Sequence, residues 1–180
     1  AFLQLLRDRL EDGSELDAAV RRVMNRLTAD CADPDLTAEA VLRESGYAPD
    51  YLRAAFRRKT GTTPVTFLTE CRVRQGARLL ERFRDRLPVS RIGALCGFEN
   101  PAYFCRCFRA ILHRSPIDYL NHYRIECASH FLTASDMTVA EIAQRCGYND
   151  SSFFIKQFRK YKNTTPKQYR TAEQNKEESA

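Results

Sequence analysis

The chain has 180 residues, of which 43% are hydrophobic and 29% are charged, and its formal net charge is +6. Seven Gly and seven Pro are too few for a β-sandwich with many tight turns, so a helical protein of one or two small domains is expected. No apolar run approaches the ~18 residues of a membrane-spanning helix, which argues against a membrane protein. The positive charge permits a polyanionic partner without requiring one.

The seven cysteines and three histidines do not form a recognisable chemical site. The cysteines are odd in number and include no C-x-x-C pair, which favours a reducing cytoplasm over a disulfide framework. Cys96 and Cys146 each precede a glycine and are predicted to be small buried packing residues. No cysteine and histidine show zinc-ligand spacing or a nucleophile–base pattern, so we expect no metal, no cofactor and no enzyme activity.

The chain begins with an amphipathic pattern and then repeats itself. Because it starts at Ala1, without Met or a signal peptide, we expect a fragment whose first residues, AFLQLLRDRL, are the tail of an upstream domain. A segment of about fifty residues then occurs three times. Each copy carries a Gly-aromatic pair, a Phe 10 or 11 residues after the Gly, and a Pro 8 residues after the Phe. These residues are Gly46-Tyr47, Phe56 and Pro64; Gly97-Phe98, Phe108 and Pro116; and Gly147-Tyr148, Phe158 and Pro166.

Each repeat is predicted to be a helix-turn-helix. Before the Gly, apolar residues recur at i, i+3, i+4 and i+7, and the Gly ends this helix because it adopts a left-handed backbone at little cost. A second helix then begins at N-cap signals, Asn100-Pro101 in the second repeat and Asp150-Ser151 in the third. The core face of the second helices is predicted to carry Leu52, Phe56, Phe104, Phe108, Phe154 and Phe158.

A longer helix is predicted to start at the proline that closes each of the first two repeats, over 64–83 and from 116 onwards. A helix of ~18–20 residues spans ~30 Å, close to the ~34 Å of one turn of B-DNA. The expected fold class is therefore all-α, with tandem helix-turn-helix units joined by long linker helices. The predicted divisions are 1–15 (upstream tail or linker), 16–84 (first repeat with its leading and linker helices), 85–135 (second repeat with its linker helix), 136–172 (third repeat) and 173–180 (flexible tail).

Positive charge gathers on the second helix of each repeat. Residues 151–163 contain four Lys or Arg, residues 101–114 contain three, and neither segment contains an acidic residue. Residues 49–62 contain four Lys or Arg against one acidic residue, Asp50. Cations that recur at matching positions are what phosphate neutralisation requires. The competing explanation, cations that only solvate a helix and favour its C-terminal dipole, does not account for this recurrence.

These residues carry a resemblance to a known family. The segments YRIECASHFL (123–132) and TVAEIAQRCGYNDSSFFIKQFRKYKNTTPKQYR (138–170) closely resemble the linker helix and second helix-turn-helix of the AraC/XylS family of bacterial transcriptional regulators. The resemblance covers residues 16–170. It implies two helix-turn-helix units on a long helix, major-groove binding to double-stranded DNA, and activation by contact with RNA polymerase. It also implies an upstream sensing or dimerisation domain.

The sequence departs from the family pattern in its first repeat. Three repeats are present instead of two, and the spacing before Gly147 favours the second and third repeats as the standard pair. Leu42 replaces the small residue that a tight helix crossing needs. Asp50 and Ala54 stand where the second repeat has Ala102 and Arg106. The first repeat is therefore expected to be partly degenerate for base reading, contacting only the DNA backbone or packing against the other repeats or a missing domain.

The candidate DNA-binding residues follow from the outer faces of the second helices. Arg106 and Lys156 are predicted to reach base edges, because Arg can contact guanine through two hydrogen bonds. Four residues at the helix starts are expected to give apolar or hydroxyl contacts, and the remaining cations are expected to bind phosphates. The alternative is a helix-turn-helix array that binds a protein, which the face of the first repeat would suit better than that of the third. The helix-start residues are Ala102, Tyr103, Ser152 and Phe153; the other cations are Arg109, Arg159 and Lys160, with Arg53, Arg57 and Arg58 in the first repeat.

Overall fold

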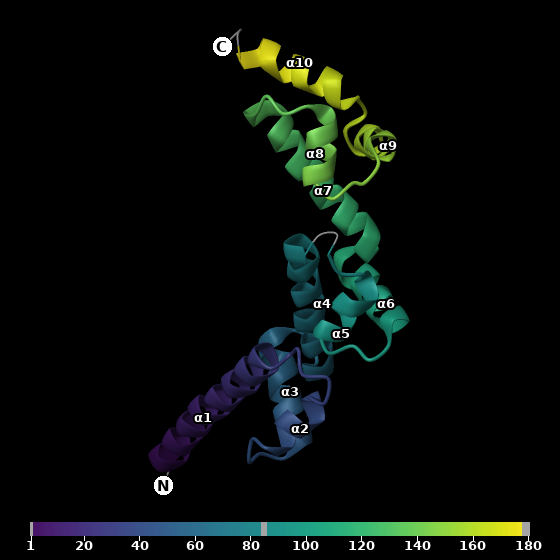
Figure 1. Cartoon of the computed structure of the whole chain (residues 1–180). Helices are drawn as coiled ribbons and strands as arrows, with labels where there is room; N and C mark the ends of the chain where they lie inside the picture. The colour runs from purple at the N-terminus through teal and green to yellow at the C-terminus, as the bar shows by residue number, and fades with distance from the viewer. Residues whose placement is uncertain (1, 84–85, 178–180) are drawn as a thin grey trace. The chain divides into compact units, whose positions relative to one another are not determined.

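The computed structural model describes residues 2–83 and 86–177, with residues 2–14 and 177 described by their backbone alone. Over this part of the chain every regular element is an α-helix, as predicted (Figure 1). Among these helices, none offers the length and hydrophobicity that a bilayer crossing requires. The helices are α1 (Phe2–Ala29), α2 (Ala38–Arg43), α3 (Pro49–Thr60), α4 (Pro64–Phe83), α5 (Val89–Leu95), α6 (Pro101–Leu112), α7 (Pro116–Ala134), α8 (Val139–Arg145), α9 (Ser151–Lys162) and α10 (Pro166–Glu177).

All three predicted repeats are present as a short helix, a tight turn and a second helix. They are α2–α3, α5–α6 and α8–α9, and the two predicted linker helices are α4 and α7. The contacts divide the chain into two compact units, 1–76 with 93–107 and 77–92 with 108–180. The domain boundaries expected from the repeats remain predictions. The predicted boundary between residues 15 and 16 falls inside α1, which is one continuous helix.

In the first compact unit, α1, α2 and α3 pack on one another (Figure 1). Their buried residues form one hydrophobic core together with Leu68 of α4. Leu52 and Phe56 of α3 are fully buried there, as the sequence predicted. The ring of Phe56 meets the edge of Phe67 on α4, with 5.5 Å between ring centroids. The first helix-turn-helix is therefore a packed three-helix structure in which α1 supplies the third helix.

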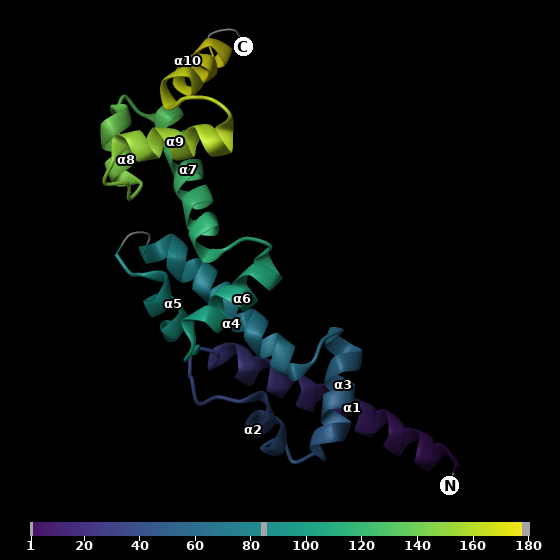
Figure 2. The ribbon, with the colours of Figure 1, turned by 90° about the vertical axis from the view of Figure 1, so that its right-hand side faces the viewer.

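In the second compact unit, α8 and α9 pack on each other and on α7, and α10 follows them (Figure 2). Phe154 and Phe158 are fully buried, with 5.8 Å between their ring centroids, and Tyr169 of α10 packs against Phe158 at 5.5 Å. The predicted apolar stripe of α8 is confirmed, since Ile142 and Ala143 are both buried. The third repeat therefore has its own core.

The residue at the fourth position of each second helix is matched to a residue of the short helix before it. The pairs are Leu52 with Leu42, Phe104 with Gly93, and Phe154 with Ala143, and all of these positions are buried. A Cβ atom added at Gly93 would lie 3.1 Å from the ring of Phe104, so the larger Phe leaves little room for a side chain there. Leu42 was expected to disturb the crossing of α2 and α3, but it is 1% exposed inside the same core as Leu52. A smaller residue on one helix offsets the larger one on the other.

The turn glycines have the predicted left-handed backbone. The φ angles are +80° at Gly46, +79° at Gly97 and +85° at Gly147. Gly97 is constrained a second time by its neighbours. A Cβ atom there would lie 2.9 Å from Nε of Arg72 and 3.0 Å from the carbonyl oxygen of Cys31, whereas nothing lies within 4 Å of one added at Gly46.

An arginine from the helix after the first repeat holds the loop that precedes the repeat. Arg72 of α4 donates through Nε to the Cys31 carbonyl at 2.8 Å and through Nη2 to the carbonyls of Asp33 and Leu36 at 2.7 and 3.0 Å. Arg170 of α10 does the same for the third repeat, donating to the carbonyls of Leu132 and Met137 at 3.1 and 2.6 Å. Hydrogen bonds from a charged donor are stronger than neutral ones, so each loop is fixed to a helix distant in sequence.

The two environments of the turn glycines give a stability test. Gly46→Ala should lower the free energy of unfolding by about 1–2 kcal/mol, the cost of a left-handed backbone for an L-residue. Gly97→Ala should lower it by more, because the added Cβ atom also meets the Cys31 carbonyl, which is backbone and cannot rotate away. Urea unfolding of both variants measures the difference, and equal losses would show that the contact around Gly97 does not constrain the fold.

Candidate nucleic-acid interface

The second helices of the second and third repeats begin at strong N-caps. The Asn100 side chain accepts hydrogen bonds from the backbone N–H groups of Ala102 and Tyr103 at 2.8 and 3.1 Å. Asp150 accepts from those of Ser152 and Phe153 at 2.6 and 3.1 Å. Both caps were predicted. The first repeat differs, because Ala48 precedes α3 and has no capping side chain.

One large aromatic side chain stands half-exposed near the start of each second helix. The exposed fractions are 49% for Tyr51, 47% for Tyr103 and 48% for Phe153, all at the third position of their helices. Tyr103 rests on Phe98 of its own turn, with 5.9 Å between ring centroids, and Phe153 rests on Tyr148 at 6.1 Å. Exposed aromatic side chains that recur at one position of three repeats indicate a contact surface.

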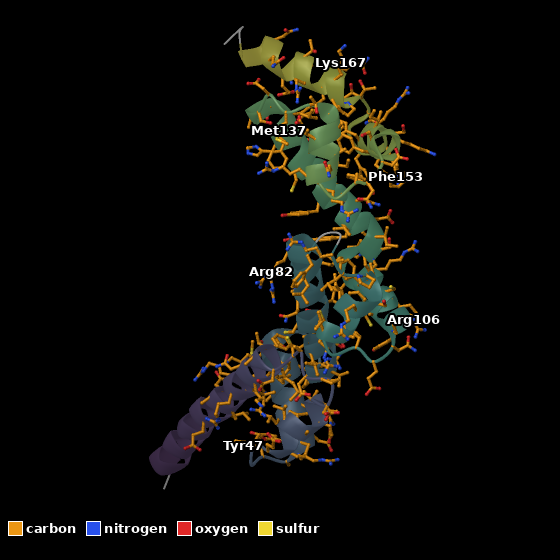
Figure 3. All side chains as sticks on the ribbon, viewed as in Figure 1. Tyr47, Arg82, Arg106, Met137, Phe153 and Lys167 are labelled. Atoms are coloured by element: carbon orange, nitrogen blue, oxygen red, sulfur yellow. The ribbon has the colours of Figure 1, made fainter. Side chains whose placement is uncertain are left out.

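The cations predicted to reach base edges lie on the outer sides of their helices. Arg106 and Lys156 are both exposed, and Figure 3 shows Arg106 projecting from α6. The Arg106 guanidinium lies 5.6 Å from the centroid of the Tyr103 ring, a cation–π arrangement that limits its freedom. A hydrogen bond with Cys107 raises the pKa of the Tyr103 phenol. The two helices α6 and α9 carry no acidic residue.

The other predicted residues of the second and third repeats are also accessible. Ala102, Ser152 and Phe153 form the exposed first turns of their helices. Arg109 and Arg159 are exposed further along α6 and α9. Lys160 is exposed as well, with its Nζ 3.8 Å from the Asp118 carboxylate and 5.2 Å from the centroid of the Tyr161 ring.

The first repeat presents a different electrostatic surface. Arg53 of α3 donates to Glu39 of α2 at 2.7 Å and to Asp50 of its own helix, so two carboxylates engage it. Lys59 pairs with Asp17 at 2.7 Å, and this hydrogen bond lowers the pKa of Asp17. The two remaining predicted cations, Arg57 and Arg58, are exposed.

One exposed residue of the first repeat was not among the predicted DNA-binding residues. Tyr51 occupies the position of Tyr103 and Phe153 and is equally exposed. Aligning the third residue of each second helix finds it. The pairing of Arg53 with Glu39 has no such signal, because the two residues are 14 positions apart and on different helices.

The two cysteines predicted to be packing residues, Cys96 and Cys146, are buried. None of the seven cysteines, all of which lie in the described part of the chain, forms a disulfide bond. Within residues 2–83 and 86–177, no three His, Cys, Asp or Glu side chains come together as metal ligands would.

Comparison with known proteins identifies the family. A family model described as a helix-turn-helix domain matches residues 41–121 and also residues 103–172, together more than two thirds of the chain. The chain belongs to the AraC/XylS family. The two matches share residues 103–121, which hold most of α6 and the start of α7. The first match runs from α2 through the second repeat, and the second match runs from within α6 through the third repeat.

Two curated relatives illustrate the similarity. The chain is 43% identical over 89 residues to the uncharacterized HTH-type transcriptional regulator YijO of Escherichia coli, covering 49% of this chain and 30% of YijO. It is 31% identical over 114 residues to the transcriptional activator RhaR of Pectobacterium carotovorum, covering 63% of this chain and 38% of RhaR. The chain thus spans less than half the length of these relatives.

A solved structure of a probable AraC family transcriptional regulator from Rhodopseudomonas palustris matches with a TM-score of 0.53 and 25% identity. The match covers 59% of this chain and 97% of that one. The solved domain is thus matched over almost its whole length, whereas a large part of this chain lies outside the match.

Tyr148, which supports Phe153, contains a buried hydroxyl. Among the described residues no hydrogen-bond partner lies within reach of this hydroxyl, and burial raises the pKa of Tyr148 to about 12. The guanidinium of Arg124 lies 5.4 Å from the centroid of the Tyr148 ring. The second repeat has Phe98 at the same position, so the ring alone suffices for the packing.

We therefore expect Tyr148→Phe to raise the free energy of unfolding by about 1 kcal/mol, because it removes a buried hydroxyl without a partner. Because the folded-state pKa is raised, wild-type stability from the neutral phenol is present below about pH 10 and is lost as the pH rises to about 12. The advantage of Tyr148→Phe should therefore grow between these pH values. Urea unfolding at pH 8 and pH 11 measures both effects.

The matched control is Tyr119→Phe. The Tyr119 hydroxyl donates to Glu81 at 2.5 Å, so its removal should lower stability. A loss of stability in Tyr148→Phe at pH 8 would mean that its hydroxyl is hydrogen-bonded after all.

Proposed function

We propose that the chain binds double-stranded DNA sequence-specifically and regulates transcription, using α6 and α9 as reading helices in successive major grooves. One observation carries the proposal: both helices combine a capped start, a half-exposed aromatic residue and an exposed cation, and neither carries an acidic residue. Family membership supports the same function. A protein-binding array with acidic faces is not what α6 and α9 present, because neither helix carries an acidic residue.

The proposed division of roles follows the position along each reading helix. Arg106 and Lys156 contact base edges, and Arg106 is held by the Tyr103 ring in a limited set of conformations. The first-turn residues Ala102 and Ser152 are small enough for the backbone to approach the bases. Arg109 and Arg159, further along the helices, neutralise phosphates and set the register.

The linker helix α7 suits this arrangement by its length. Its 19 residues correspond to about 28 Å, near the ~34 Å repeat of B-DNA. We further infer that the longer protein acts in the bacterial cytoplasm and activates transcription through RNA polymerase, as the resemblance implies and as the name of the relative RhaR suggests. Dimerisation through a segment outside this chain belongs to the same proposal.

The first repeat is proposed to bind the DNA backbone without reading bases. Its only counterpart to Arg106 is Ala54, and the nearby Arg53 is engaged by Glu39 and Asp50. Arg57 and Arg58 remain exposed on α3 for phosphates. The first repeat would then add affinity that is the same for every sequence.

The first experiment is selection of DNA from a random library with residues 1–180, followed by footprinting of the enriched site. Base-specific protection in two successive major grooves is expected. Base preference in three grooves would show that the first repeat reads DNA. Failure to enrich any sequence would favour the protein-binding alternative.

Arg106→Ala should reduce specificity. We expect it to weaken binding to the selected site by about 1–3 kcal/mol and to leave binding to unrelated duplexes nearly unchanged. The matched variant Arg159→Ala should weaken both duplexes alike and lower the slope of log K against log salt by about 0.9. Fluorescence anisotropy with both duplexes at several salt concentrations distinguishes these results. Equal weakening of both duplexes by Arg106→Ala would refute its base-reading role.

The role of the first repeat has a separate test. The double variant Arg57→Gln/Arg58→Gln should weaken selected and unrelated duplexes by the same factor and lower the salt slope by up to about 1.8. Asp50→Asn should strengthen binding to both, because it removes a carboxylate from the face turned to phosphates. A changed base preference in the library selection with either variant would contradict backbone-only binding.

A further inference from the structure

An open cleft of about 400 Å³ lies in the second compact unit where two second helices end. The C-terminal end of α6 and the turn after it form one side, α7 forms the floor, and the C-terminal end of α9 forms the other side. The lining residues are Arg109, His113 and Arg114; Ser115, Asp118 and His122; and Lys160 and Tyr161.

The cleft has a surplus of positive charge. Arg109, Arg114 and Lys160 are basic, and Asp118 is the one carboxylate among the lining residues. The Asp118 carboxylate also accepts a hydrogen bond from the Ser115 hydroxyl at 2.8 Å. Its distance to Nζ of Lys160 is 3.8 Å, well beyond the ~2.7–2.9 Å of a strong charge-assisted hydrogen bond. Lys160 therefore keeps its capacity to bind another anion.

The walls of the cleft are fixed by contacts between α9 and α7. The Tyr161 hydroxyl donates to the Asp118 carbonyl at 3.4 Å, and the Tyr161 ring meets the His122 ring edge-on at 5.7 Å. Lys162 pairs with Glu126 one turn further along α7 at 2.8 Å. On the opposite side, His113 has a left-handed backbone with φ of +57°, which ends α6 and leads directly to Arg114. The cations are thus presented by a built surface.

We propose that this cleft binds one phosphate of the DNA backbone, between the two segments read by α6 and α9. This proposal rests on the proposed function. Sequence reasoning assigned Arg109 and Lys160 to phosphates separately, but the structure places both on one cleft and adds Arg114. Because guanidinium groups bind phosphate oxygens in pairs of hydrogen bonds, two arginines and a lysine suit a phosphodiester. One phosphate would then link the ends of both reading helices.

Three single variants of the full chain test the cleft. Arg114→Gln should weaken binding to the selected duplex about tenfold at 0.1 M salt and lower the salt slope by about 0.9. Asp118→Asn should tighten binding about threefold, since it removes the carboxylate that opposes the phosphate. Lys176→Gln removes one positive charge on α10, outside the cleft, where Lys176 pairs with Glu173 of the same helix, and it should change affinity by less than about twofold. Anisotropy titrations measure all three, and circular dichroism verifies that each variant is folded.

A duplex with one neutral methylphosphonate in place of a phosphate locates the contact. The methylphosphonate is placed in turn at each position between the two protected grooves. At one position it should weaken binding by the wild-type chain but cause no further loss with Arg114→Gln, because that variant already lacks the contact. Competition by inorganic phosphate distinguishes a site for free anions from a site for the DNA backbone. If the cleft binds the backbone, millimolar phosphate at constant ionic strength should not displace the duplex.

The outcomes separate the two proposals. If the chain enriches no DNA, the proposed function fails and the cleft proposal falls with it. If it binds a selected site but Arg114→Gln and Asp118→Asn both match the wild type, DNA binding stands and the cleft proposal is overturned. Additive losses for Arg114→Gln and every methylphosphonate position, or displacement by inorganic phosphate, would also overturn it.

Discussion

The side chain at the fourth position of each second helix is fully buried and packs against the short helix before it. In the second repeat, Phe104 fills the space left by two glycines: a Cβ atom at Gly76 would lie 2.8 Å from its ring and one at Gly93 would lie 3.1 Å from it. In the first repeat the fourth residue is Leu52, which lies in the same core as Leu42. Since proteins are packed as densely as organic crystals, these matched volumes determine how closely the two helices approach. The same packing fixes the position of the exposed aromatic residue that precedes the fourth position, which is Tyr51, Tyr103 or Phe153.

The repeat made much of this fold predictable from the sequence. Three copies of one pattern revealed the buried phenylalanines, the left-handed glycines and the N-caps at Asn100 and Asp150, because each depends on residues close together in the chain. The compensation between Leu42 and Leu52 was missed, since the replacement at position 42 was considered without its partner. The carbonyl contacts of Arg72 were missed for another reason. They join positions separated by 36 to 41 residues, and a carbonyl acceptor leaves no side-chain signature.

The sequence also predicted only part of the candidate site. Sequence counting treats all cations alike, yet their surroundings differ. Arg53 is engaged by two carboxylates, whereas Arg106 lies over an aromatic ring and Lys160 stands at the edge of a cleft. The desolvation and pairing of a charge decide whether it remains available to a partner. Which helices carry the positive charge was therefore predictable from sequence, but which of the charges are neutralised within the protein was not.

The contact around Gly97 bears on how this chain can be divided. The turn of the second repeat is covered by the end of α1 and its loop, through Arg72 and the Cys31 carbonyl. A shortened protein that begins at α4 would contain a pair of repeats of ordinary family length. It would nevertheless leave Arg72 without its three carbonyl acceptors and would expose a surface that is buried at Gly97. The first repeat consequently completes the second, and these two repeats are not interchangeable modules.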